Sequence, residues 1–229
     1  MAPFVITVTG SSNLSHAAEL ATLNITIAET SKIYSEACTI VLHVSNTIKS
    51  LLNDKSKPGS EDGIVSWTSK TIPSISYDSL KGSRVVPRVA TSFAITFRDF
   101  VLLAEWAVML AAMKSVKVEN INWTVKKETK ALLKGKSRRA SAADALGKAG
   151  DFAQALGIER ERVQPLELKD SEVGMHARGN NGSGGLGMLG DLGGWEVKGP
   201  LVFAVEEISF NHRIDAKFAV ESPERHVKH

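Results

Sequence analysis

The sequence predicts an α+β protein, with helices packed on a largely antiparallel sheet. Segments rich in Val, Ile, Thr and Phe alternate apolar with polar residues, as half-buried strands do. Other segments repeat their apolar residues every three or four positions, as amphipathic helices do. The order along the chain is strand-strand-helix-strand and then strand-helix-strand-helix-strand-strand. We therefore expect two strand-helix-strand units that share one fold.

Two strands and a helix are expected first. Phe4–Gly10 is rich in β-branched residues and leads into a Gly-Ser-Ser turn. Glu19–Thr30 alternates Leu and Ile with Thr and Asn, which is typical of a strand with one buried face. Ser31 is a candidate N-cap, after which apolar residues follow the helical period: Tyr34, Cys38, Val41, Leu42, Ile48, Leu51 and Leu52.

The middle of the chain predicts strands around a second helix. Ile64–Asp78 and Arg84–Arg98 are strand-like, and the second has a clear alternation of apolar and polar residues near its end. Asp99 is the expected N-cap of a helix that runs to about Lys114. Asn120–Thr129 is the next expected strand.

The stretch Arg138–Gly157 predicts a third helix with a narrow seam of small residues. Its small and apolar positions have helical spacing: Ala142, Ala145, Leu146, Ala149, Phe152, Ala153 and Leu156. Gly157 stands where a helix needs a left-handed C-terminal residue. Such a seam predicts close packing against a sheet or another helix, and Val163–Lys169 is expected to follow as a strand.

The C-terminal part combines a glycine-rich segment with one long strand. Residues 173–199 are so rich in glycine that a flexible loop is expected. Leu201–Val220 predicts the last strand, with a bulge near His212 where the alternation slips. Residues 222–229 are expected to form a frayed tail. The prediction is a single domain over 1–229, made of two intertwined halves of about 1–80 and 81–222.

Composition excludes several classes of protein. A formal net charge of +3 is too small to predict nucleic-acid binding. With one cysteine, Cys38, no intramolecular disulfide can form, and its apolar neighbours favour a buried position. No apolar run is long enough to span a bilayer, and the N-terminus does not resemble a secretion signal. We therefore expect a cytoplasmic protein without membrane insertion.

No motif in the sequence predicts a catalytic, cofactor-binding or metal-binding site. Gly182–Gly187 fits the dinucleotide pattern G-x-G-x-x-G, but no helix pattern follows it. The histidines lack the Cys, Asp or Glu neighbours at a spacing that holds zinc. Trp195, beside the glycine-rich segment, and His212, at the expected bulge, are the candidate contacts for a partner or ligand. We expect no catalytic, cofactor-binding or metal-binding residues.

Four segments give the chain a family resemblance. They are Val8–Ser11, Ala21–Ile27, Phe93–Phe100 and Arg139–Gly157; the last carries Ala142, Asp144, Ala145, Lys148, Ala149, Ala153, Leu156 and Gly157. In this order they resemble the SIMPL-domain family, whose bacterial members include periplasmic immunogenic proteins and an oxidative-stress-defence protein. The resemblance implies an α+β fold, homo-oligomers and no established enzymatic activity. We expect the chain to depart from the family in lacking a signal peptide and in its long glycine-rich segment.

Two hypotheses about function follow. The first is a non-enzymatic, self-associating intracellular protein connected with the stress response, since long antiparallel strands leave edges that association covers. The alternative is a module that binds a small molecule or peptide, with the glycine-rich segment as a lid and Trp195 as an anchor. An enzyme would need a polar cleft with convergent titratable groups.

Overall fold

The computed structural model describes residues 4–55, 63–70, 74–80, 84–178 and 203–220. The chain divides into two compact units, here called unit 1 and unit 2. Unit 1 holds β1 (Phe4–Ala17), α3 (Lys127–Ala155), the 3-10 turn Arg160–Arg162, β7 (Val163–Arg178) and β8 (Glu207–Val220). Unit 2 holds β2 (Leu20–Thr30), α1 (Tyr34–Lys55), β3 (Ile64–Ser69), β4 (Ser74–Leu80), β5 (Arg84–Phe97), α2 (Phe100–Ala111) and β6 (Val116–Thr124). The antiparallel sheets and packed helices confirm the predicted α+β class.

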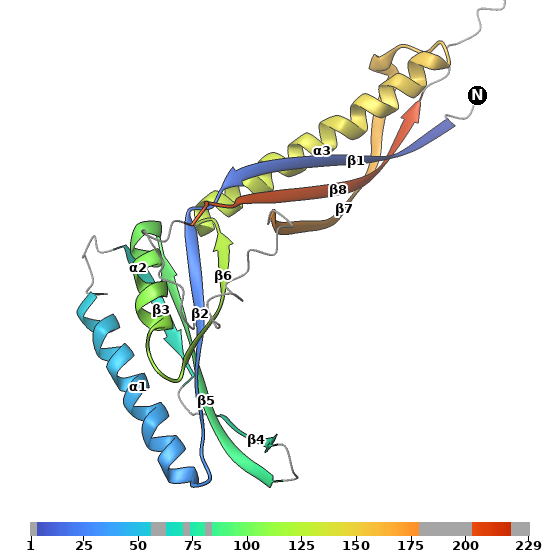
Figure 1. Ribbon diagram of the computed structural model, residues 1–229. Coiled ribbons are helices and arrows are strands. Elements are labelled where there is room, and N and C mark those ends of the chain that lie inside the picture. The colour runs from blue at the N-terminus through green and yellow to red at the C-terminus, as the bar shows by residue number, and fades with distance from the viewer. Residues whose placement is uncertain (1–3, 56–62, 71–73, 81–83, 179–202, 221–229) are drawn as a thin grey trace, which may run out of the picture. The chain divides into compact units, whose positions relative to one another are not determined.

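Unit 1 is a three-stranded antiparallel sheet in the order β1-β8-β7, with α3 lying along it (Figure 1). β1 and β8 pair without interruption from Phe4 opposite Val220 to Ala17 opposite Glu207. The turn predicted at Gly10 is therefore wrong, because β1 continues straight through that residue. The predicted bulge near His212 is confirmed in its place, but the extra residue belongs to β7: Ser171 and Gly174 pair with Arg213 and Asn211, so two residues of β7 lie opposite His212. A second irregularity lies at Pro165–Glu167.

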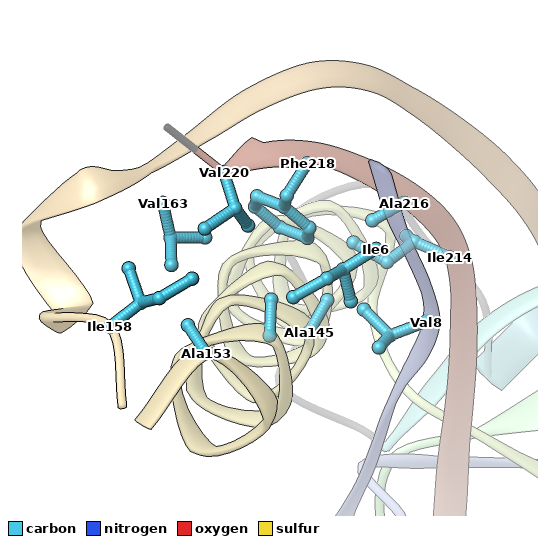
Figure 2. Close-up of a cluster of buried hydrophobic side chains, with 11 residues drawn as sticks. Ile6, Val8, Ala145, Ala153, Ile158, Val163, Ile214, Ala216, Phe218 and Val220 are labelled. Atoms are coloured by element: carbon cyan, nitrogen blue, oxygen red, sulfur yellow. The ribbon is translucent and has the colours of Figure 1, made fainter. Parts of the chain in front are cut away.

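The small-residue seam of α3 is the reason for the glycine in β1. The buried row of α3 repeats every four residues: Ser137, Ser141, Ala145, Ala149 and Ala153. A methyl group on Gly10 would collide with the Ser141 carbonyl and come within 2.8 Å of the Ala145 Cβ. Gly10 thus allows the helix axis to approach the sheet closely, and the predicted close packing is confirmed. Figure 2 shows the apolar cluster that results, with Phe218 and Ile6 from the sheet over the alanines.

The third helix is longer than predicted and ends as predicted. It starts at Lys127, so the end of the expected strand Asn120–Thr129 is helical. At the other end Gly157 has φ +75°, the Gly157 N–H donates to the Gln154 carbonyl (2.9 Å) and the Ile158 N–H to the Ala153 carbonyl (3.0 Å). These two bonds form a Schellman cap, which explains the glycine.

Unit 2 is a five-stranded antiparallel sheet with the order β3-β5-β2-β6, in which β4 also pairs with β5. Leu23, Ile25 and Ile27 of β2 are buried and lie on the face that α1 and α2 cover. Asp99 caps α2 as predicted, because its carboxylate accepts hydrogen bonds from the Val101 and Leu102 N–H groups. The expected strand Ile64–Asp78 is divided into β3 and β4.

Two of the sequence expectations concern larger stretches of the chain. The expected loop 173–199 is wrong for residues 173–178, which form the end of β7; from 179 on it lies outside the described residues, and so does the tail 222–229. The halves 1–80 and 81–222 stay a prediction about how the chain is organised, and the two contact-based units have different bounds.

Candidate functional site

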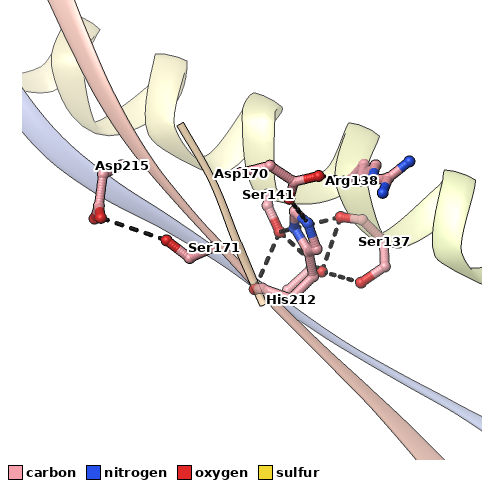
Figure 3. Close-up of polar contacts among 8 residues, drawn as sticks. Ser137, Arg138, Ser141, Asp170, Ser171, His212 and Asp215 are labelled. Atoms are coloured by element: carbon pink, nitrogen blue, oxygen red, sulfur yellow. Dashed lines mark hydrogen bonds and ion pairs between the residues drawn. The ribbon is translucent and has the colours of Figure 1, made fainter. Parts of the chain in front are cut away.

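His212 lies at the centre of a polar cluster inside unit 1, here called the His212 cluster. Its other members come from three elements: Ser12 of β1, Ser137, Arg138 and Ser141 of α3, and Asp170 of β7 (Figure 3). His212 is therefore the candidate residue around which the fold brings other polar groups together. The second candidate, Trp195, lies outside the described residues.

Both ring nitrogens of His212 have partners. Nε2 lies 2.5 Å from Asp170 Oδ1, and Nδ1 lies 3.0 Å from Ser141 Oγ. An ionised carboxylate only accepts hydrogen bonds, so Nε2 carries a proton. In the neutral ring Nδ1 then accepts from the Ser141 hydroxyl, whereas in the protonated ring it donates to the same oxygen.

Because of the serine hydroxyls, the His212 ring keeps its hydrogen bonds whether it is neutral or protonated. Ser141 Oγ also lies 3.1 Å from the Ser137 carbonyl and 3.2 Å from the His212 carbonyl. If Nδ1 donates to it, the Ser141 proton turns to one of these carbonyls. Ser12 Oγ donates to the Ser137 carbonyl at 2.9 Å. The buried polar atoms of the cluster are thus paired in both states, which is what a buried network needs to be stable.

The same geometry argues against hydrolytic chemistry at these residues. A Ser-His-Asp set normally exposes the serine to substrate and buries the carboxylate. Here the order is reversed, because Ser141 is fully buried while the Asp170 side chain is 50% exposed. Asp170 also forms an ion pair with Arg138, with Nε 3.1 Å from Oδ2. A buried hydroxyl cannot reach an incoming carbonyl. The hydrogen bonds of the cluster instead tie α3 to β7 and β8.

A hollow of about 390 Å³ adjoins the cluster within unit 1. It is lined by Ser11, Ser12, Asn13, Gly174, Asn211, His212 and Arg213. Asn13 and Gly174 both face Asn211 across the sheet, so the missing side chain at Gly174 leaves space there. Its polar lining would suit a small polar or anionic ligand.

Two carboxylates of unit 1 have pKa values that their neighbours lower. The hydrogen bond from Lys148 (2.7 Å) and then that from the Ser11 N–H (2.8 Å) lower the pKa of Asp144. Hydrogen bonds from Lys217 and Lys169 lower the pKa of Glu167. Both side chains are partly exposed, so solvent weakens these interactions.

Other candidates resolve into structural roles. Cys38 is partly exposed on α1, so the expectation of a buried thiol is wrong. Trp106 and Trp123 are buried, with Trp106 against Phe97 and Trp123 against Phe100. Within the part of the chain that the structure describes, no three His, Cys, Asp or Glu residues are grouped to hold a metal ion. None of the described helices has the length and apolar character to span a membrane.

Sequence reasoning missed the partners of His212 because they lie far apart in the chain. Asp170 is 42 residues from His212 and Ser141 is 71 residues away. One local signal was present. Ser137 and Ser141 continue the alanine seam at four-residue spacing, and serines on a buried helix face require polar partners.

The fold and the His212 cluster define an α+β protein with antiparallel sheets and a buried polar network between helix and sheet. The chain belongs to the SIMPL family, described as protein of unknown function (DUF541), whose family model matches residues 6–212. This confirms the resemblance inferred from the sequence. No curated protein matches the chain.

Proposed function

We propose that this SIMPL protein is a non-enzymatic protein that works by self-association. The observation that carries the proposal is the set of large apolar side chains exposed on the margins of unit 1. They are Leu146 and Phe152 on α3, Leu156 directly after it, and Leu166 and Leu168 on β7. Exposed apolar surface is typical of sites that bind another protein when it is contiguous.

The His212 cluster supports the non-enzymatic part of the proposal. Its serine is sealed from solvent, and its hydrogen bonds are directed at other groups of the fold. A role in the stress response follows from the family resemblance, and the cytoplasmic location stays a prediction from the sequence.

The test is the mass of the full-length protein in solution. Size-exclusion chromatography with light scattering should give a multiple of the 24.7 kDa chain mass that decreases on dilution. A strictly monomeric protein over a wide range of concentrations contradicts the proposal.

The hollow beside His212 favours a second candidate function, the binding of a small polar or anionic ligand. Native mass spectrometry of the purified protein should then detect a bound compound, and Arg213→Ala should lose it. Retention of the compound by Arg213→Ala, or its loss from the control Arg139→Ala at an exposed position of α3, would count against this site.

A further inference from the structure

The two edges of the three-stranded sheet in unit 1 differ in how their backbone groups are satisfied. At the β1 edge, Lys148 Nζ donates to the Thr9 carbonyl (3.0 Å), and the Ser11 N–H donates to Asp144 Oδ2 (2.8 Å). Side chains of α3 thus occupy backbone groups to which another strand would bind. Among the described residues β7 pairs with β8 alone, so its outer edge is available.

The β1 contacts also indicate which groups of β7 face outward. Because Thr9 directs its carbonyl away from β8, its partner Asp215 directs its own groups toward β7. Lys169, opposite Asp215, therefore exchanges hydrogen bonds with β8. The N–H and C=O groups of the neighbouring Leu168 and Asp170 then point to the open edge.

We infer that a second copy of this chain pairs with β7 through an antiparallel strand contact centred on Leu168. This inference rests on the proposed self-association and names its interface. In this register Leu168 lies opposite Leu168 of the second copy, and each Glu167 lies opposite a Lys169. The latter pairs are of the narrow, non-hydrogen-bonded kind, in which side chains are closest.

Charge excludes the neighbouring symmetric registers. Centring on Glu167, Lys169 or Asp170 places that residue opposite its own copy, so that like charges face each other. Directly opposite residues of an antiparallel pair share one face of the sheet, so the two-fold axis passes through a residue. Among these four centres, only Leu168 sets opposite charges against each other on both sides of the axis.

Apolar side chains support the same contact on the helix side of the sheet. Leu168 faces that side with Ala216, yet it is 55% exposed, because β7 is the edge strand. Arg138, Ala142 and Leu146 form one row on α3, and Arg138 of this row reaches Asp170. Leu146, 49% exposed, is thus on the side of α3 that faces the contact. Pairing buries both leucines.

Backbone features on both sides limit the length of the β7 segment that can pair. Pro165 has no N–H to donate, and the irregularity at Ser171–Gly174 interrupts the strand on the other side. The paired stretch is thereby limited to Leu166–Asp170.

Charge reversal in the full-length protein tests the contact. Glu167→Lys and Lys169→Glu should each raise the dissociation constant of self-association about tenfold, since symmetry creates two like-charged pairs. The double variant should restore it. Glu119→Lys and Lys117→Glu are matched controls, because these residues form the same kind of ion pair on the edge strand β6. Urea unfolding checks that each variant remains folded.

Cysteine cross-linking tests the register. In a Cys38→Ala background, Leu168→Cys should give a disulfide-linked dimer on mild oxidation, whereas Leu166→Cys should not, because its own copy lies four residues away along the pair. Self-association without this cross-link and without any effect of charge reversal would overturn the inference and leave the proposed function standing. A monomer at all concentrations would overturn both.

Discussion

The hydrogen-bond partners of the His212 ring are side chains of two other elements of unit 1, α3 and β7. The ring is buried, and it joins β8 to Ser141 of α3 and to Asp170 of β7. We predict that His212→Ala lowers the free energy of unfolding by about 2–4 kcal/mol, because it leaves a cavity and removes two hydrogen bonds. His43→Ala, at an exposed position of α1, should change it by less than about 0.5 kcal/mol. Equal effects in urea unfolding would contradict a supporting role for His212.

Asp144 should make stability depend on pH. Its pKa is lowered from 3.8 by Lys148 and by the Ser11 N–H, so the folded chain binds this proton less readily than the unfolded chain. The stabilisation is therefore present above the ordinary carboxyl pKa and is lost as the pH falls through the lowered value. We predict that Asp144→Asn has a lower urea midpoint than the parent at pH 7 and that the difference disappears near pH 2. Glu105→Gln, at an exposed position of α2, serves as the control. A difference that persists unchanged in acid would refute the prediction.

Two glycines of unit 1, Gly10 and Gly147, differ in the space that is available for a side chain. A side chain at Gly10 would strike the backbone of α3, whereas one at Gly147 would meet nothing within 4 Å. We predict that Gly10→Ala destabilises the protein by about 1–3 kcal/mol through overpacking. Gly147→Ala should stabilise it by about 1 kcal/mol, because alanine is the better helix former. Urea unfolding of the two variants checks both signs, and the same sign for both would show that the helix does not lie as close to β1 as described.

The elements that were predictable are those whose signals are local. The α3 seam, the Asp99 cap and the Gly157 cap depend on residues within a few positions of each other, and all three are confirmed. The turn at Gly10 was predicted wrongly because the reason for this glycine lies on α3, far along the chain. The sequence alone does not distinguish a glycine that allows a helix to pack closely from a glycine that forms a turn.

At the scale of the whole molecule, the family was identified from the order of four segments along the chain. No single residue was enough to identify it. The His212 cluster could be predicted only as one histidine, because β7, β8 and α3 bring its members together from distant positions. The two edges of the unit 1 sheet also differ, because Asp144 and Lys148 of α3 bind backbone groups at one of them. The fold was thus more predictable than the site, since partners across a sheet leave no local pattern.

The division into two units predicts separate responses to damage in one core. The cluster of Figure 2 draws its residues from unit 1 alone, and unit 2 has its own buried side chains, such as Ile25, Phe97 and Leu110. We predict that Gly10→Ala speeds amide hydrogen exchange in β1, β8 and α3, since local stability follows local packing. Exchange in β2, β5 and α2 should remain as slow as in the parent. Gly147→Ala provides the control in which neither unit exchanges faster. Equal loss of protection in both units would mean that they unfold as one cooperative body, and the contact-based division would then have no counterpart in stability.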